Sequence, residues 1–216
     1  MVMQAMRVRS VLDIGCGSGM FLRVFAEHGV KDIQGVDGDY VPRQHIQIPA
    51  SRFLVHDLQT PLRLPRRFDL VVSLEVGEHL MDADADGFIS TICRHGDIAL
   101  FSAAIPGQGG TNHVNEQFPD YWAKKFATHG YSGFDLFRRE LWGDEEIATW
   151  YRQNLLLFAN KKGLSKQKRL AALIKRTPPW KSLNIVHPNL YISRVNELRA
   201  QEQLVAYLYE RLLESA

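Results

Sequence analysis

Three glycines at alternate positions, Gly15, Gly17 and Gly19, follow an apolar run that contains one aspartate, Asp13. A glycine turn between a strand and a helix exposes backbone N–H groups and lets a ligand approach the main chain closely. The spacing differs from the G-x-G-x-x-G of dinucleotide-binding turns, and an acid just before the turn repels phosphate. Asp13 therefore favours a ligand that carries a cation, such as an ammonium group, near this turn.

Two further acids follow at the ends of the next two predicted strands. Asp37 comes eighteen residues after Gly19, about where an acid binds ribose hydroxyls in nucleotide-binding α/β folds. Asp57 follows the third predicted strand, where its carboxylate could accept a hydrogen bond from an adenine amino group. An ammonium, a ribose and an adenine together describe S-adenosylmethionine.

A second group of residues suits chemistry on an acceptor. Glu75, Glu78 and His79 follow the fourth predicted strand with an E-x-x-E-H spacing, and His113 follows the fifth in "NHVNEQF". We keep three interpretations open. The four side chains could bind a divalent ion with open positions for substrate oxygens; His79 or His113 could act as a general base without metal; or the residues could be structural.

The elements that must position these residues alternate between strand and helix. Short apolar runs and helical spacing predict strands at 10–14, 32–36, 52–56, 68–74, 97–102, 131–136 and 155–158, and helices at 20–28, 85–94 and 118–129. This order implies an α/β fold with a doubly wound, mostly parallel seven-stranded sheet. The carboxyl ends of neighbouring parallel strands then bring the loops after the fourth and fifth strands together. A glycine-rich loop spans 106–111 between the fifth strand and the next helix.

Composition sets the broad class. The chain has 216 residues, 45% of them hydrophobic, and a net charge of +2, which suits one globular domain and no general polyanion binder. Cys16 and Cys93 form no disulfide framework and no metal-type spacing. The sequence shows no signal peptide and no run long enough for a membrane span, so we expect a cytoplasmic protein.

The character of the chain changes after residue 160. Eight Lys or Arg residues and no acid occur in 161–181, 186–193 could be extended, and 196–215 has the spacing of an amphipathic helix with Leu198, Val205, Leu208 and Leu212 on one face. We therefore expect a cofactor-binding domain at 1–160 and a basic, helical C-terminal extension at 161–216 that packs on or covers it.

The motifs also resemble those of the class I S-adenosylmethionine-dependent methyltransferases, over roughly residues 8–158. The matching segments are "VLDIGCGSG", "GVDGDY", "VHDLQTPL", "FDLVVSLEVGEHL" and "GDIALFSAAIP". The resemblance implies a Rossmann-like methyltransferase fold. It also implies a set of cofactor contacts: Asp13 and the Gly15 backbone at the methionine part, Asp37 at the ribose, Asp57 and the Leu58 backbone at the adenine, with Cys16, Gly17 and Gly38 beside them.

The E-x-x-E-H element resembles that of ubiquinone-type O-methyltransferases and of small-RNA 2′-O-methyltransferases. In these groups it is linked to a divalent metal, and in the RNA enzymes a later histidine completes the site. The resemblance makes His113 the matching histidine here. Members of the class usually have a helical segment before the first strand, whereas about nine residues precede it here. We therefore expect a more exposed cofactor, a cover formed by the C-terminal extension, or a native chain that begins before Met1.

We expect an enzyme that methylates a hydroxyl of a small-molecule acceptor, and a sugar, glycan or secondary metabolite is the acceptor that we favour. An alcohol is a poor nucleophile, so a metal or a base favours oxygen as the acceptor. An RNA 2′-O-methyltransferase is the alternative, supported by the basic stretch but not by the low net charge. Two further alternatives are a nicotinamide-dependent oxidoreductase and a non-catalytic cofactor-binding protein. The sequence predicts no oligomeric state.

Overall fold

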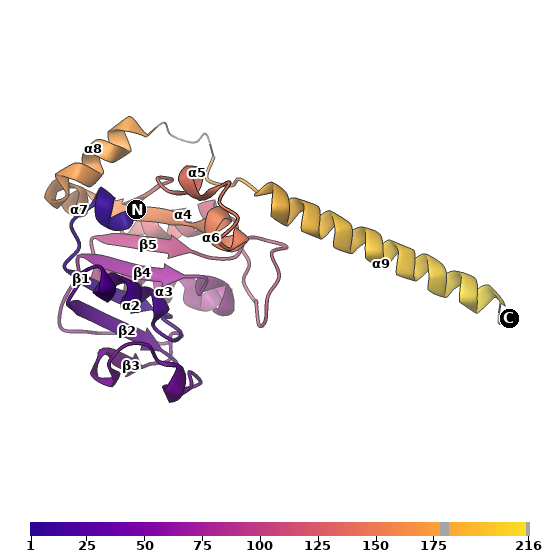
Figure 1. Ribbon diagram of the computed structural model, residues 1–216, viewed down its shortest axis with the longest axis horizontal. Helices are drawn as coiled ribbons and strands as arrows, with labels where there is room; N and C mark the ends of the chain where they lie inside the picture. Colours follow the sequence, from indigo (N-terminus) through magenta and orange to yellow (C-terminus); the bar gives the residue numbers. More distant parts are fainter. Residues whose placement is uncertain (178–181, 215–216) are drawn as a thin grey trace.

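The computed structural model describes residues 1–177 and 182–214 of the chain. Its core is a seven-stranded sheet with the strand order β3-β2-β1-β4-β5-β7-β6 (Figure 1). β1 to β5 run parallel, and β7 is antiparallel to both β5 and β6. The strands are β1 Ser10–Ile14, β2 Asp32–Asp37, β3 Phe53–Val55, β4 Leu70–Leu74, β5 Ile98–Ser102, β6 Tyr131–Phe134 and β7 Leu156–Asn160. The predicted doubly wound, mostly parallel sheet is confirmed.

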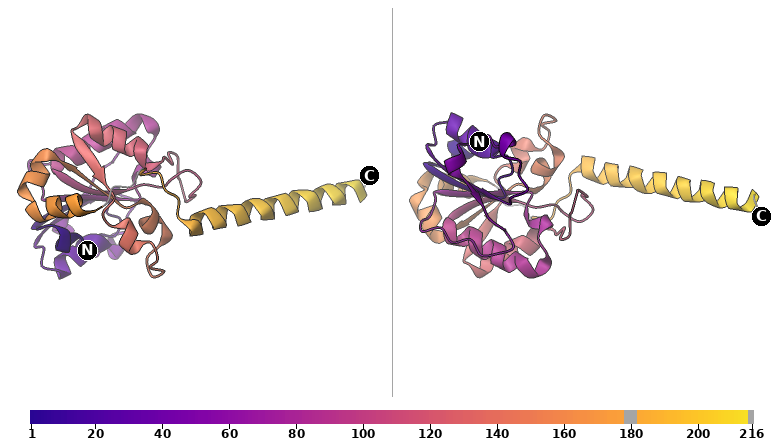
Figure 2. Two further views of the ribbon diagram at one scale, coloured as in Figure 1. Left: turned by 90° about the horizontal axis from the view of Figure 1, so that it is seen from above. Right: turned by 90° about the horizontal axis from the view of Figure 1, so that it is seen from below.

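Helices cover both faces of this sheet (Figure 2). Successive strand residues point to opposite faces, so Leu12 and Val71 pack in one apolar cluster with α3 and α4, while Val11 and Val72 pack in the other with α1 and α2. The helices are α1 Val2–Ala5, α2 Met20–Glu27, α3 Ala85–His95, α4 Pro119–Thr128, α5 Arg138–Leu141, α6 Thr149–Asn154, α7 Lys161–Lys166, α8 Lys168–Arg176 and α9 Pro188–Glu214, with short 3-10 helices η1 Arg43–His45, η2 Ala50–Arg52, η3 Gly77–His79 and η4 Asp82–Asp84. Both faces are thus buried, as the continuous apolar strands require.

The chain changes direction across the sheet at β1. From β1 it builds outward through β2 and β3, then returns to add β4 and β5 on the other side of β1. The carboxyl ends of β1 and β4 therefore form the crevice in which open α/β sheets bind their ligands.

The basic helices α7 and α8 pack at the opposite edge, where the parallel strands begin. Leu170 of α8 is fully buried and α8 contacts α1. Lys162 and Lys166 of α7 lie 4.0 and 3.1 Å from the carboxylate of Asp97, which precedes β5. This part of the extension packs against the sheet and α1, and it lies away from the crevice. Residues 178–181 of the basic stretch lie outside the described residues.

Helix α9 differs from the prediction because it projects away from the rest of the chain (Figures 1 and 2). The four apolar side chains expected on its packing face, Leu198, Val205, Leu208 and Leu212, are all at least half exposed. The helix also begins earlier than predicted, at Pro188, so the expected extended segment is wrong from that residue on. Proline favours the first turn of a helix, a signal that the apolar run around it concealed.

Hydrogen bonds to the domain hold the segment that leads into α9. Arg138 Nη1 donates to the carbonyl of Leu183 at 3.1 Å, and the N–H of His187 donates to the side chain of Gln153. Over residues 1–177 and 182–214, no helix combines the length and the apolar character needed to cross a membrane. The domain boundary at 160/161 stays a prediction.

Candidate active site

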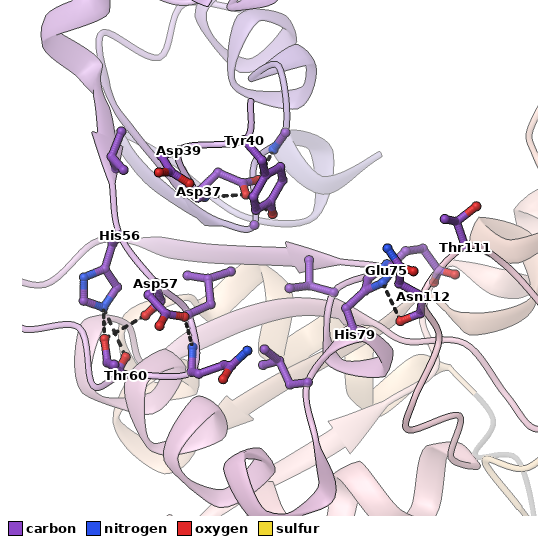
Figure 3. A pocket seen from close by; sticks show the side chains of 18 residues that line it. Asp37, Asp39, Tyr40, His56, Asp57, Thr60, Glu75, His79, Thr111 and Asn112 are labelled. Atoms are coloured by element: carbon purple, nitrogen blue, oxygen red, sulfur yellow. Dashed lines mark hydrogen bonds between the residues drawn. The ribbon is translucent and has the colours of Figure 1, made fainter. Parts of the chain in front are cut away.

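A cavity of about 1130 Å³ opens at the carboxyl ends of the parallel strands. Loops after β1, β2, β3, β4 and β5 all contribute to its wall (Figure 3). Of the residues expected at the cofactor or the acceptor, those that line the cavity are Gly15, Gly17, Asp37, Gly38, Asp57, Leu58, Glu75 and His79. The structure therefore brings together residues from four separate motifs.

The glycine turn after β1 depends on backbone angles that side chains rarely adopt. Gly15 and Gly17 have φ angles of 80° and 52°, in the left-handed region that glycine reaches without strain. A Cβ atom added at Gly15 would lie 2.3 Å from Val76 Cγ2, whereas one added at Gly17 would meet no atom within 4 Å. Gly15 is thus needed for packing, and Gly17 keeps the wall of the cavity free of a side chain.

Asp37 is tied to this turn at the end of β2. Its carboxylate accepts hydrogen bonds from the N–H groups of Gly17 at 2.5 Å and Gly38 at 2.7 Å, and from the hydroxyl of Tyr40. Tyr40 was not predicted as part of the site, although its position three residues after Asp37 is a usable signal. Its hydroxyl bonds to the same carboxylate that is expected to bind the ribose.

Asp13 and Cys16 do not line the cavity. Asp13 is buried at the end of β1, and within the described residues its Oδ2 atom has no hydrogen-bond partner. Burial, with the nearby charge of Asp37, raises the pKa of Asp13 to about 8. Such a carboxyl becomes charged at neutral pH only when a cation or donor compensates its burial. The Cys16 side chain packs in the apolar core, so only its backbone faces the turn.

Asp57 and Leu58 form the far wall of the cavity, after β3 (Figure 3). Asp57 is exposed, and its Oδ1 atom accepts the N–H of Gln59 at 3.0 Å. The carbonyl of Asp57 also accepts from the N–H and hydroxyl of Thr60. These bonds fix a tight turn that presents one Asp57 carboxylate oxygen to the cavity wall.

Glu75 has an unusual backbone and a network of amide partners. Its φ angle is 55°, in the left-handed region, where strain in a non-glycine residue often accompanies function. Its N–H donates to Ser102, and its carboxylate accepts from Gln108 Nε2 at 2.8 Å and Asn154 Nδ2 at 3.1 Å. Gln108 and Asn154 are partners that the sequence does not reveal, because they lie 33 and 79 residues away.

Glu78, His79 and His113 converge next to the cavity. One potential metal-binding atom from each lies within 4.8 Å of the other two, and the two imidazole rings are 4.9 Å apart. Glu75, the fourth ligand expected from the sequence, is not in this group. Its carboxylate is bound instead by the two amides.

Glu78 is the most unusual member of this group. Its side chain is fully buried, and neither carboxylate oxygen has a hydrogen-bond partner among the described residues. Burial, and then the neighbouring Glu75 charge, raise the pKa of Glu78 well above its ordinary value. A buried carboxylate without partners is costly unless a proton or a cation compensates it.

The two histidines are oriented by their Nδ1 atoms. His79 Nδ1 lies 3.3 Å from the carbonyl of Asn112, and His113 Nδ1 lies 2.8 Å from Glu116 Oε1. Both acceptors belong to the loop after β5 and lie in the segment "NHVNEQF". The Glu116 side chain was expected near the site with this segment, whereas the Asn112 carbonyl was not. These bonds leave Nε2 of each ring available to a ligand, which is the arrangement found around protein-bound metals.

Comparisons with known proteins agree with the geometry. The family model described as "Methyltransferase domain" matches residues 4–140. No curated protein matches the sequence. Solved structures with the same fold include the sugar N-methyltransferase KedS8 from a Streptoalloteichus species, at 17% identity and a TM-score of 0.54, over 71% of this chain and 80% of that one.

Two further structures are similar over comparable lengths. The methyltransferase domain of bacterial CtHen1 matches at 19% identity with a TM-score of 0.54, over 74% of this chain and 93% of that one. CalS10, an amino pentose methyltransferase from Micromonospora echinaspora, matches at 15% identity with a TM-score of 0.53, over 72% of this chain and 84% of that one. At these identities the likenesses establish the fold.

Proposed function

Because the chain belongs to the methyltransferase domain family, we propose that this S-adenosylmethionine-dependent methyltransferase methylates a hydroxyl of a sugar-like acceptor, with a divalent ion held by Glu78, His79 and His113. The membership excludes the nicotinamide-dependent oxidoreductase from the alternatives. The convergence of buried Glu78 with the two histidines beside the cavity carries the proposal.

The cofactor-binding residues fit S-adenosylmethionine. Asp13 holds an unpartnered buried oxygen that suits the ammonium group, and the open side of Gly17 leaves room beside it. The Asp37 carboxylate then accepts hydrogen bonds from the ribose hydroxyls in place of the hydrogen bond from the Tyr40 hydroxyl. Asp57 and the Leu58 backbone bind the adenine. The sulfonium of the bound cofactor supplies an activated methyl group. The chain itself must hold the acceptor hydroxyl in line with that methyl group and take up a proton.

The donor set fits a divalent ion. It consists of one carboxylate whose burial is uncompensated and two imidazoles whose Nδ1 atoms already have acceptors. Two histidines and one carboxylate leave coordination positions open for substrate oxygens. A bound ion would lower the pKa of an acceptor hydroxyl. The amides of Gln108 and Asn154 hold Glu75 beside this group, where Glu75 forms the wall of the cavity at the acceptor side.

The charge of the cavity favours a neutral or cationic acceptor. Besides Asp37 and Asp57, which are assigned to the cofactor, its described lining includes Asp39 and Glu75, and it holds no Lys or Arg residue. A polyanion such as RNA needs cations along its path, whereas the basic helices α7 and α8 lie at the opposite edge of the sheet. KedS8 is described as a sugar N-methyltransferase and CalS10 as an amino pentose methyltransferase, which supports a sugar acceptor and leaves the choice of oxygen to rest on the proposed ion.

A methyl-transfer assay with labelled S-adenosylmethionine tests the proposal. The acceptors are neutral sugars, amino sugars, phenols and a short RNA with a free 2′,3′-diol, each with and without EDTA. We expect transfer to oxygen of a neutral sugar, loss of turnover in EDTA, and recovery with excess Mn²⁺ or Mg²⁺. Glu78→Gln should abolish turnover, whereas Asp86→Asn, an exposed acid on α3, should leave it unchanged.

Other outcomes identify the alternatives. Full activity in EDTA, lost in His79→Ala or His113→Ala, would assign one of these histidines as a general base without metal. Transfer to an amino sugar nitrogen would replace O-methylation by N-methylation. Methyl transfer to RNA, with a rate that falls steeply as salt rises, would identify an RNA 2′-O-methyltransferase.

A further inference from the structure

The glycine-rich loop between β5 and α4 is built around one carboxylate, that of Glu116. Glu116 Oε2 accepts the N–H of Gly107 at 2.8 Å, and Oε1 accepts the N–H of Gly109 at 2.7 Å and His113 Nδ1 at 2.8 Å. Gly107 and Gly109 have φ angles of 82° and 69°, which point their N–H groups inward at little cost because they lack a Cβ. The loop therefore cradles its own acid and does not present these N–H groups to a substrate phosphate.

The third glycine of the loop makes room for the histidine. A Cβ atom added at Gly110 would lie 2.3 Å from His113 Nε2. A side chain there would push the imidazole out of its place beside His79. The three glycines thus serve one arrangement, in which Glu116 fixes the loop and His113 lies between Gly110 and Glu116.

The hydrogen-bond directions define the tautomer of His113. The two N–H groups of Gly107 and Gly109 donate to the Glu116 carboxylate, which acts as an acceptor, so His113 Nδ1 carries the proton. The lone pair of neutral His113 then lies on Nε2. The pair is largely shielded from solvent, since the His113 and Glu116 side chains are only 12% and 19% exposed.

We propose that Glu116 is a positioning residue that holds His113 as the Nδ1–H tautomer, with Nε2 directed to the ion shared with Glu78 and His79. This inference rests on the proposed metal-assisted function. Glu116 itself does not bind the ion. It acts through His113, as carboxylates that bond to a metal-binding histidine do.

Mn²⁺ binding to the purified protein, measured by calorimetry without acceptor, tests the proposal apart from turnover. We expect Glu116→Ala to weaken Mn²⁺ binding about 10- to 100-fold and Glu116→Gln to retain part of the affinity. Binding of S-adenosylmethionine should stay unchanged in both. Asp120→Ala, a half-exposed acid four residues further on, is the matched control.

A double-mutant cycle separates positioning from a general loss of loop structure. Glu116→Ala should cost nothing further in a His113→Ala background, because its effect passes through that ring. Nitrogen NMR of the histidines should show His113 as the Nδ1–H tautomer in the wild type and a mixture in Glu116→Ala.

Two results would overturn this inference and leave the metal-assisted function intact. One is an unchanged Mn²⁺ affinity in Glu116→Ala. The other is that Glu116→Ala lowers the Mn²⁺ affinity equally in the wild-type and His113→Ala backgrounds. A wild-type protein that binds no divalent ion would overturn the metal-assisted function and this inference with it.

Discussion

Asp13 and Glu78 are buried acids that lack a hydrogen-bond partner on at least one oxygen within the described residues; unlike buried Asp135, which pairs with Arg138, they have no cationic side chain beside them in the described ion pairs. They are expected at different parts of the site, Asp13 at the methionine part of the cofactor and Glu78 beside the acceptor. The sequence predicts both positions, because strand ends at the carboxyl edge of a parallel sheet are where ligands bind. It does not predict their burial or their missing partners, which depend on loops that are distant in sequence.

Asp37→Ala should weaken S-adenosylmethionine binding by about 1–3 kcal/mol, as expected when hydrogen bonds to a charged group are lost. The fold should survive, because the side chain contributes little to the apolar core. Calorimetry against Asp86→Ala measures the difference. Equal affinities in the two variants would remove Asp37 from the ribose site.

Asp13 should make the stability of the cofactor-free protein depend on pH. Its folded pKa of about 8 lies above the ordinary value of 3.8, so the folded protein keeps a proton that the unfolded chain releases. Stability is therefore lost as pH rises between these values, by up to about 1.4 kcal/mol per unit. An asparagine side chain does not titrate, so the stability of Asp13→Asn relative to the wild type should increase from pH 4 to 8. The variant should also bind S-adenosylmethionine more weakly.

Urea denaturation of both proteins across this range measures the effect. The difference between them should grow up to about pH 8 and stay constant above it. Curves that remain parallel at every pH would contradict the burial of a titrating Asp13.

At the scale of elements, the strands and their succession along the chain follow from the sequence, because short apolar runs end in recognisable turns. The glycine turn after β1 and the acid at the end of β2 were predictable for this reason. The loop after β5 was not, since its conformation depends on Glu116 and on contacts with His79. Glu75, expected as a fourth ligand, stands outside the group of Glu78, His79 and His113. Its amide partners could not be predicted for the same reason, because they come from the loop after β5 and from α6.

The glycine turn allows a paired prediction. Gly17→Ala meets only backbone strain, about 1–2 kcal/mol for a left-handed residue, so the protein should fold but bind S-adenosylmethionine poorly. Gly15→Ala adds a clash with Val76 and should lose more stability, by a further 1–3 kcal/mol or so. Urea melts and calorimetry of the two variants test this order. The reverse order of stability would contradict the assigned packing of the turn.

At the scale of the molecule, the cavity and the basic helices lie at opposite edges of the sheet. The described lining of the cavity at the carboxyl edge includes four acids and no Lys or Arg residue, whereas α7 and α8 lie at the edge where the parallel strands begin. The sequence alone could not show where the basic helices lie, because their position depends on the antiparallel direction of β7, which precedes them. Helix α9 leaves the domain altogether, although Arg194 near its start donates a hydrogen bond to the Gln108 carbonyl in the loop after β5.

Removal of residues 198–216 should change the free energy of unfolding by less than about 0.5 kcal/mol, the usual range for exposed positions. Leu198, Leu204 and Val205 are more than half exposed, and the truncated chain keeps Arg194. Leu170→Ala on buried α8 is the contrast and should cost about 2–5 kcal/mol. A comparable loss from the truncation would show that α9 packs against the domain or a second chain.

Anomalous scattering from crystals grown with Mn²⁺ tests directly whether Glu78, His79 and His113 share one divalent ion. We expect one peak within roughly 2.0–2.6 Å of a Glu78 oxygen and of Nε2 in both histidines. Glu75 should remain with Gln108 and Asn154. If no peak lies between Glu78, His79 and His113 at saturating Mn²⁺, or if the only peak lies elsewhere on the protein, these three residues do not share an ion.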